Sequence, residues 1–467
     1  YMRRLGLFFI TLFIISGITL IGINRYKNKS ADENPEIFKF CISDGRCGLA
    51  DEDGNIVLEP KYVINGFMNG FAPIYSLKEN KIGFIDASGK IVIRPKFEDV
   101  GDFSSDGFAP AFNGKWGIIN KKGDFMTQEN FFEINPFFSK NGLIGAAKAE
   151  DSWGFIDKSG NWIIPAQFDF VFDFKDNGLA AVKKEGKYGF VNEKGEIVIE
   201  PVFEGFFHYK NGLTVVWADG KYQLIDKNGS LMSAQFTEIS GYRFNDNFTF
   251  ANSDEGVWGI VGTDGKFTPK PDIQNVTISY RYAMDAIADL KNGKKAFVNE
   301  EGGIVEINFD SMGIFANGLA SVRLEEELIG YIDANMQVVL KPVFEDTRGF
   351  SNALAAVKKE GSWGFIDKKG EFVIEPQFDD TTSFNENGLA AVKADEGWGI
   401  INEKGKWVLK PKYFEILSIE EGRFFINSRE RYGYTDKKGK ILFWIDYGSN
   451  SVIKNAKGKI VWQDSDL

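Results

Sequence analysis

Short apolar runs alternate with polar turn signals along nearly the whole chain. The run Trp-Gly-Phe-Ile at 153–156 precedes the turn signal Asp-Lys-Ser-Gly at 157–160, and a second apolar run follows it. An Asp or Asn, two polar residues and a Gly are typical of a type I turn followed by a left-handed residue, which joins two antiparallel strands. The runs are rich in β-branched and aromatic residues, and no continuous helical period is present. The pattern therefore predicts an all-β protein.

The same unit recurs about every 35 residues, and individual steps run from 33 to 38 residues. A fixed period of this size indicates tandem copies of one supersecondary unit. The residue that follows the aromatic of each unit marks twelve copies: Gly48, Gly83, Gly117, Gly154, Gly189, Gln223, Gly259, Phe297, Gly330, Gly364, Gly399 and Gly433.

Each unit has recognisable later parts. A Pro-x-Phe or Pro-x-Tyr element follows the second apolar run, as at Pro201 and Phe203. Proline cannot donate to a strand ladder, so we expect it to end the second strand. The unit closes with Asn-Gly-Leu-Ala-Ala-Val, as at 177–182. The unit is thus predicted to be a meander of three strands, with a short fourth strand around Phe168 to Phe172.

Two architectures accommodate such tandem antiparallel β-meanders. The favoured one is propeller-like, with radially arranged sheets, and the alternative is an open solenoid of stacked β-hairpins. The unevenness of the motifs divides the array into repeats 1 to 5 at 37–221, degenerate repeats 6 to 8 at 222–328, and repeats 9 to 12 with a terminal half repeat at 329–467. At Asp333 to Met336 the turn Gly is replaced, and we expect Asn335 to supply the left-handed residue.

The first residues have the composition of a membrane segment. Leu5 to Ile23 is nearly all apolar, with basic residues on both sides, and reaches the roughly 20 residues that cross a bilayer. No clear cleavage site follows, so we predict an uncleaved signal anchor or transmembrane helix at 1–26 and a polar tether at 27–36, and the alternative is a cleaved signal peptide. This arrangement predicts a single-pass protein of the cell membrane whose repeat domain lies outside the cytoplasm.

The two cysteines, Cys41 and Cys47, lie six residues apart. The same offset separates Val182 from Tyr188 in a regular unit, on strands expected to be adjacent. A disulfide there would staple a terminal repeat; the alternative is a pair of buried thiols. With His208 as the chain's single histidine, the two cysteines cannot close a zinc site, so no metal is expected.

Composition narrows the classes of function. The net charge of −11 and a pI near 5.0 argue against nucleic acid as a partner. A single histidine, together with the absence of phosphate-binding loops, offers no catalytic constellation and no cofactor site. We therefore expect no enzymatic activity and assign no catalytic residues.

Ten tryptophans are present, and five of them hold the aromatic position of the repeat, where packing between layers is their expected role. Trp162, Trp217 and Trp407 lie outside that position. They are the candidates for stacking against sugar rings, and the alternative for each is a structural role.

Three motifs in fixed order, Trp-Gly-Phe-Ile-Asp-Lys-Lys-Gly at 363–370, Pro-x-Phe-Asp/Glu and Asn-Gly-Leu-Ala-Ala-Val, resemble the WG-containing repeat found in many bacterial proteins. The resemblance covers about Phe38 to Trp462, with departures at Gln223 and Phe297. It implies a β-repeat architecture and an interaction role, and it supplies no catalytic residues.

These observations lead to one primary functional hypothesis and two alternatives. The primary hypothesis is a membrane-anchored, extracytoplasmic binding or scaffolding module of the bacterial cell envelope, attached through its N-terminal helix. The first alternative is a cell-envelope protein that binds glycans. The second is a propeller-type hydrolase or lyase, which rests on analogy of fold alone.

Overall fold

The computed structural model describes residues 37–42, 44–128, 130–175, 177–207, 213–245, 248–279, 285–298, 303–323, 328–420, 423–436, 438–446 and 452–464. These residues form strands and turns without any helix, as the alternating pattern predicts. Within these ranges, no helix is long and apolar enough to span a membrane. The expected anchor at 1–26, the tether at 27–36 and His208 lie outside the described residues.

The first half of the chain forms five antiparallel sheets, in which strands follow one another in sequence order. The first sheet contains β1 (Phe38–Cys41), β2 (Cys47–Ala50), β3 (Ile56–Ile64), β4 (Phe71–Ser76), β5 (Lys81–Asp86) and β6 (Ile91–Phe97). The second and third contain β7 (Asp99–Val100), β8 (Phe108–Phe112) and β9 (Trp116–Asn120), then β10 (Glu133–Ile134), β11 (Ile144–Ala149), β12 (Ser152–Ile156) and β13 (Trp162–Phe168). The fourth and fifth contain β14 (Phe170–Val171), β15 (Leu179–Lys184), β16 (Lys187–Asn192) and β17 (Ile197–Phe203), then β18 (Gly205–Phe206), β19 (Leu213–Ala218), β20 (Lys221–Asp226), β21 (Phe236–Asn245), β22 (Phe248–Ser253), β23 (Trp258–Gly262) and β24 (Phe267–Pro269).

The second half forms five further sheets of the same kind. Two of them contain β25 (Ile273–Ser279), β26 (Asp285–Leu290), β27 (Lys295–Val298) and β28 (Ile304–Glu306), then β29 (Ser311–Met312), β30 (Leu319–Arg323), β31 (Ile329–Asp333) and β32 (Val338–Phe344). The next two contain β33 (Asp346–Ser351), β34 (Leu354–Lys359), β35 (Ser362–Ile366) and β36 (Phe372–Phe378), then β37 (Asp380–Thr381), β38 (Leu389–Ala394), β39 (Gly397–Asn402) and β40 (Trp407–Tyr413). The last contains β41 (Glu415–Glu420), β42 (Arg423–Asn427), β43 (Arg431–Thr435), β44 (Ile441–Asp446), β45 (Val452–Asn455) and β46 (Ile460–Gln463).

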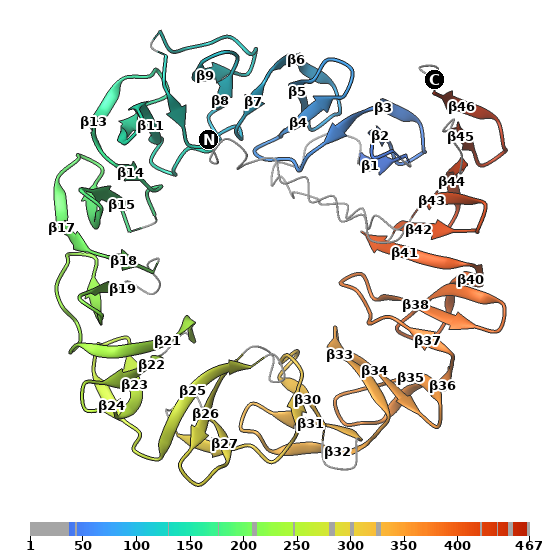
Figure 1. The fold of residues 1–467 in the computed structure, drawn as a ribbon. Coiled ribbons are helices and arrows are strands. Elements are labelled where there is room, and N and C mark those ends of the chain that lie inside the picture. Colours follow the sequence, from blue (N-terminus) through green and yellow to red (C-terminus); the bar gives the residue numbers. More distant parts are fainter. Residues whose placement is uncertain are drawn as a thin grey trace.

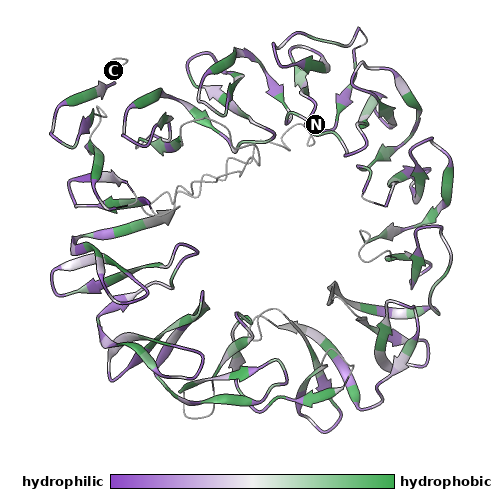
Figure 2. Cartoon of the chain, turned by 180° about the vertical axis from the view of Figure 1, so that it is seen from behind, coloured by the Kyte–Doolittle hydropathy of each residue, from purple (hydrophilic) through white to green (hydrophobic). Residues whose placement is uncertain are grey.

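The sheets follow one another around a ring, and the first and last sheets are neighbours (Figure 1). Within a sheet, the later strands such as β13, β17 and β36 lie towards the periphery, and strands such as β15 and β19 lie nearer the middle. Hydrophobic segments lie mainly in the strands and hydrophilic segments in the connecting turns (Figure 2). The prediction of tandem antiparallel hairpin sheets is confirmed.

Sheet β14 to β17 illustrates the regular unit. The Leu-Ala-Ala-Val strand β15 pairs with the aromatic-Gly strand β16, which pairs with β17. The short fourth strand expected near Phe168 to Phe172 is present as β14, but it opens the next sheet instead of completing the preceding one. A four-stranded sheet of this kind therefore combines parts of two successive sequence units.

The polar signal forms the predicted hairpin loop. At 157–160 the Asp157 carboxylate accepts hydrogen bonds from the backbone N–H groups of Ser159 and Asn161, at 2.8 and 2.9 Å. Gly160 then adopts a φ of 85°, the left-handed conformation that such a loop requires. At 333–336 this conformation is adopted by Met336, with a φ of 61°, so the expectation for Asn335 is wrong. The hairpin register fixes which residue is left-handed. The backbone N–H of Met336 donates to the Asp333 carbonyl, as the N–H of Gly160 does to the Asp157 carbonyl.

Proline does not end the second strand, contrary to our expectation. Pro201 lies inside β17, and pairing with β16 resumes two residues later at Phe203. The register shifts between the pairs Phe190 with Ile199 and Tyr188 with Phe203, which marks a β-bulge. The outermost strand of a sheet tolerates proline at a bulge because its missing N–H leaves no ladder bond unmade.

This bulge explains the glycine after the repeat aromatic where proline lies in the following strand, as at Gly189, Gly330 and Gly364. A Cβ added to Gly189 would lie 2.5 Å from the Ile199 carbonyl oxygen and 2.6 Å from the Pro201 nitrogen. The bulged backbone thus passes directly over the glycine. Phe297 departs from the pattern where no bulge is present, since β27 and β28 pair without a register shift. Gln223 likewise lies on β20, which pairs with β21 only through Tyr222 and Phe236.

Neighbouring sheets contact one another through the turn glycines. A Cβ added to Gly195 would lie 3.2 Å from Ile164 of the preceding sheet. The same contact crosses the junction of the ring, where a Cβ added to Gly54 of the first sheet would lie 2.9 Å from Leu442 of the last. A hydrophobic cluster also spans this junction, with members from both ends of the chain: Phe38, Phe40, Ile42, Ala50, Tyr434, Leu442, Phe443, Ile445, Ile453 and Trp462.

Candidate binding surface

The register places three residues directly opposite one another across the first three strands of a sheet, at the level of the repeat aromatic. We call such a set a cross-sheet row. In sheet β33 to β36 the row is Asp346, Lys358 and Trp363, and in sheet β37 to β40 it is Asp380, Lys393 and Trp398. Directly opposed residues of an antiparallel pair share one face of the sheet, so each row presents its side chains together.

In these two sheets the row is an acid, a lysine and a tryptophan. Arg348 connects the two rows, because its guanidinium lies 4.9 Å from the Trp363 ring centroid and 2.8 Å from the Asp380 carboxylate of the next sheet. Trp363 is buried, Trp398 is half-buried and Lys393 is exposed. The tryptophan therefore packs between sheets, as expected for the repeat position, and the charged members face solvent.

In sheet β14 to β17 a phenylalanine replaces the acid and the lysine is kept, and in sheet β18 to β24 a glycine and a tryptophan replace both charged members. The first row is Phe170, Lys183 and Tyr188, and the second is Gly205, Trp217 and Tyr222. A Cβ added to Gly205 would lie 1.9 Å from the Trp217 indole, so the ring lies on the Gly205 backbone.

Together with Phe172 and Phe206, the rings of Phe170 and Tyr188 form a connected aromatic strip, which we define as Phe170, Phe172, Tyr188 and Phe206. Trp217 and Tyr222 form a separate aromatic pair. Ring centroids are separated by 5.1 Å between Phe170 and Phe172, and by 5.4 Å between Phe172 and Phe206. The Tyr188 ring lies 5.5 Å from Phe206. Trp217 and Tyr222 are 5.8 Å apart. Phe170 is 37% exposed and the other five rings are half-buried.

The residue after the ring that pairs with the repeat aromatic is acidic in several sheets and binds the turn that precedes the aromatic strand. Asp169 accepts a hydrogen bond from the Gly186 backbone N–H at 2.8 Å, and Glu204 pairs with Lys187 at 3.2 Å. In two sheets this position is a phenylalanine, at Phe132 and Phe414, and both rings are exposed. The type of residue at this position, and its exposure, therefore differ between sheets that share the same strand order.

Three carboxyl groups on neighbouring sheets have raised pKa values. Burial raises the pKa of Asp102 and Glu133. Burial also raises the pKa of Asp99, although a hydrogen bond from the Val100 N–H acts in the opposite direction. These residues do not form a metal site: among the residues that the structure describes, no group of three or more His, Cys, Asp or Glu side chains could hold a metal ion. Burial also raises the pKa of Tyr331 to about 12.

The three tryptophans predicted to stack against sugars lie on three different sheets and do not converge. Trp162 on β13 is half-buried, and its ring lies 5.7 Å from Phe131. Trp407 on β40 is 40% exposed and lies near Phe378. Trp217 on β19 is half-buried and pairs with Tyr222. The members of the aromatic strip are not tryptophans, and contacts between neighbouring sheets bring them together.

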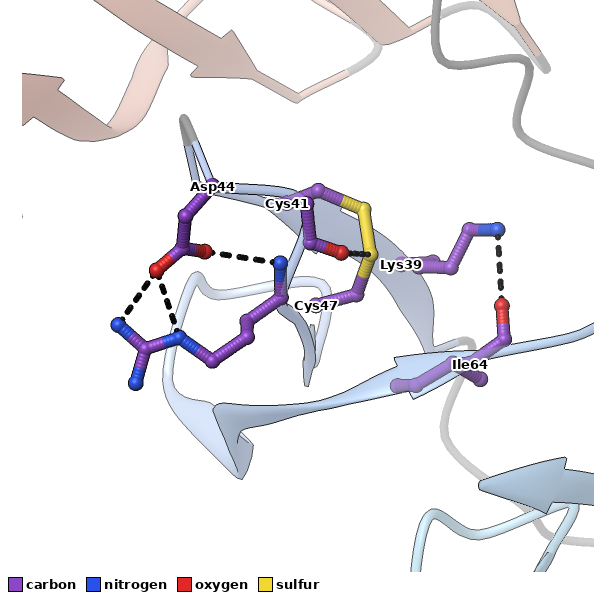
Figure 3. The surroundings of a disulfide bond; sticks show 7 residues. Lys39, Cys41, Asp44, Cys47 and Ile64 are labelled. Atoms are coloured by element: carbon purple, nitrogen blue, oxygen red, sulfur yellow. Dashed lines mark hydrogen bonds and ion pairs between the residues drawn. A yellow bond between two sulfur atoms is a disulfide. The ribbon is translucent and has the colours of Figure 1, made fainter. Parts of the chain in front are cut away.

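Cys41 and Cys47 are joined by a disulfide between the paired strands β1 and β2 (Figure 3). The repeat equivalence by which we predicted it is wrong by one residue. In the regular sheet Val182 faces Gly189 and Lys183 faces Tyr188. Cys41, which faces Cys47, therefore corresponds to Lys183, because the turn between β1 and β2 is one residue longer.

Comparison with known proteins identifies the class. The WG containing repeat matches residues 82–115, 153–188, 188–222, 297–326, 329–363, 363–397 and 398–429, which together make up just over half of the chain. The chain belongs to the WG-containing repeat family. No curated protein sequence matches it.

Similar solved structures are numerous and distant, with 566 matching chains. A computationally designed protein, Ika8, is 13% identical with a TM-score of 0.20, over 65% of this chain and 93% of its own. A eukaryotic initiation factor is 12% identical with a TM-score of 0.26, over 73% and 95%. PorZ, a bacterial surface component of the type-IX secretion system of Porphyromonas gingivalis, is 12% identical with a TM-score of 0.22, over 86% and 67%. Likenesses of this size carry no argument about function.

Proposed function

We propose that this protein is a membrane-anchored, extracytoplasmic binding or scaffolding module, without catalytic activity, built as a closed propeller-like ring. The proposal rests on one observation: some positions of the sheets recur and are structural, and others vary from sheet to sheet. Glycines, turns and the Pro-x-Phe bulge recur in most sheets as a framework, and the cross-sheet rows differ between sheets, from charged to aromatic. A rigid framework with a variable exposed row suits recognition of a ligand.

Closure of the ring is supported by the junction cluster and by the contact of Gly54 with Leu442. The membrane anchor is supported by the apolar segment at 5–23, and the extracytoplasmic location by the disulfide, which persists in oxidising compartments.

The test uses the full chain in its native membrane. Protease added to intact cells should cut the repeat domain, and cutting only after lysis would overturn the extracytoplasmic location. Crosslinking should capture a reproducible envelope component whose recovery falls in the Lys393→Glu variant, which alters a cross-sheet row. Lys404→Glu is the matched control, because Lys404 is equally exposed but lies in a hairpin turn. Equal recovery from both variants would count against the rows as the binding surface.

A further inference from the structure

The outer edges of two sheets carry an apolar residue at a position that is polar elsewhere. In the strands that follow the polar hairpin turn and carry proline before a Phe or Tyr, the residue directly before that ring is exposed. It is valine in β17 and β32, where Val202 is 55% exposed and Val343 is 49% exposed. In the other strands of this kind it is a lysine or a glutamine: Lys61, Lys96, Gln167, Gln377 and Lys412. Polar side chains on outer strands oppose the association of sheet edges, so the two valines remove this protection.

The same two strands are alike in sequence and opposite in charge. β17 reads Ile-Val-Ile-Glu-Pro-Val-Phe, and β32 reads Val-Val-Leu-Lys-Pro-Val-Phe. Glu200 and Lys341 occupy the same position of the two strands, and both are exposed. Among the residues that the structure describes, neither of these side chains takes part in an ion pair. Each strand therefore presents an exposed valine and a charge two residues apart, with opposite signs on the two strands.

Both strands lie at the ends of their sheets. β17 is the last strand of the sheet that begins with β14, and β32 is the last strand of the sheet that begins with β29. They occupy separate places on the periphery of the ring (Figure 1). The two edges therefore do not meet within one molecule, but the edge of one molecule can meet the other edge of a second.

We propose that copies of this chain associate head to tail, with the β17 edge of one copy against the β32 edge of the next. The contact removes Val202 and Val343 from water and pairs Glu200 with Lys341 across the two copies. A contact between two identical edges would oppose two glutamates or two lysines, so charge selects the mixed contact. Because a mixed contact leaves one edge of each kind unused, further copies can add.

This self-association goes beyond the proposed binding function, because neither edge includes a residue of a cross-sheet row. The contact is small, since each copy contributes the edge of a single strand. We therefore expect association at high protein concentration and low salt, where the ion pair is screened least.

The experiment is sedimentation velocity of the detergent-solubilised full chain over a concentration series at low salt. The average mass should rise with concentration and pass that of a dimer. Glu200→Lys and Lys341→Glu should each raise the concentration required at least about tenfold, because like charges then face each other. Glu375→Lys is the matched control, since Glu375 is exposed at the same position of β36, where Gln377 replaces the valine. It should change this concentration by less than about twofold.

A mixture of the two charge variants tests the pairing itself. The β17 edge of the Glu200→Lys variant can pair with the β32 edge of the Lys341→Glu variant, and the β17 edge of the second can pair with the β32 edge of the first. Association of the mixture should therefore return to the wild-type concentration. Val202→Gln, which introduces the residue of β13 and β36, should weaken association without lowering the melting temperature.

Three results would overturn this inference: the mass of a single copy at every concentration, an equal effect of Glu375→Lys and Glu200→Lys, or a mixture that stays dissociated. Crosslinking to an envelope component is measured separately, through Lys393→Glu and Lys404→Glu. Failure of self-association thus leaves the proposed binding function standing, and failure of the crosslinking leaves self-association standing.

Discussion

Arg46 and Asp464 form an ion pair although 418 positions of sequence separate them. Arg46 lies in the turn between β1 and β2, and Asp464 follows β46 directly. Their side chains are 15% and 4% exposed, and Asp44 contacts the same guanidinium. Nearby, the Arg423 guanidinium lies 4.9 Å from the Phe38 ring. Charged and apolar contacts therefore join the two ends of the described chain at one junction.

Loss of this ion pair should weaken the junction. Arg46→Ala removes the ion pair of Arg46 with the buried Asp464 carboxylate, which should lower the free energy of unfolding by about 2 kcal/mol. Chemical denaturation followed by tryptophan fluorescence measures the change. Lys61→Ala is the control, because its pair with Glu59 is exposed on both sides and should contribute little. An equal effect of both substitutions would contradict a role of Arg46 in closure.

The disulfide should stabilise the same junction. Replacement of Cys41 and Cys47 by serine, or reduction of the wild-type protein, should cost about 2 kcal/mol for a closed loop of this length. Hydrogen exchange should then speed up in β1 and β2 and also in β44 to β46, since both groups share the junction cluster. Faster exchange confined to β1 and β2 would show that the two ends are energetically independent.

The glycine after the repeat aromatic should be indispensable wherever the bulge lies above it. In Gly189→Ala the new Cβ would meet the Ile199 carbonyl at 2.5 Å, so the backbone must shift, at a cost of about 3 kcal/mol. Gln223→Ala is the comparison at the equivalent position of a unit that has a side chain there, and its cost should stay below about 1 kcal/mol. Melting temperatures of the two variants would reveal the difference, and similar values would refute this explanation of the glycine.

Met336 adopts a left-handed conformation that costs a residue with a Cβ about 1 kcal/mol. Met336→Gly should therefore be more stable than Met336→Ala by about this amount. Both variants lose the same packing against the neighbouring cluster, so their difference isolates the backbone term. Denaturation midpoints provide the measurement. Greater stability of the alanine variant would be incompatible with the assigned conformation.

The half-buried carboxyl groups predict a pH dependence. Because burial raises the pKa of Asp102 in the folded state above its unfolded value, the folded protein binds more protons. The stabilising contribution is fully present below the unfolded pKa and is lost as the pH rises through the folded pKa. Asp102→Asn should thus stabilise the protein at pH 7, with a gain that shrinks as the pH falls towards the unfolded pKa. Melting curves across this range test the sign, and a gain that grows on acidification would contradict it.

Local sequence signals predicted much of the fold. The Asp157 to Gly160 loop follows from side-chain hydrogen bonds within four residues, and strands on either side follow from their apolar runs. The prediction that Pro201 ends its strand was wrong, because the effect of a proline depends on which edge of the sheet it occupies, and here the strand continues through a bulge. Met336 was misread for a related reason: the hairpin register imposes the conformation, whatever residue stands there.

Site residues were less accessible to sequence reasoning. Trp162, Trp217 and Trp407 were singled out by residue type, but type does not say which sheet a residue occupies or what lies opposite. Phe170 and Tyr188 carried no distinguishing signal alone, since similar residues recur in most units. Counting residues across the turn between the Leu-Ala-Ala-Val strand and the aromatic strand could have shown that Lys183 lies opposite Tyr188.

The sequence by itself determined the strands, their turns and the number of repeats, because each depends on interactions among residues close along the chain. Only the tertiary structure decided that Phe172 meets Phe206, that Gly54 meets Leu442, and that Arg46 meets Asp464. Those contacts depend on the rotation of each sheet relative to the next. That rotation accumulates over twelve units, and no single unit of sequence specifies where it brings the last sheet.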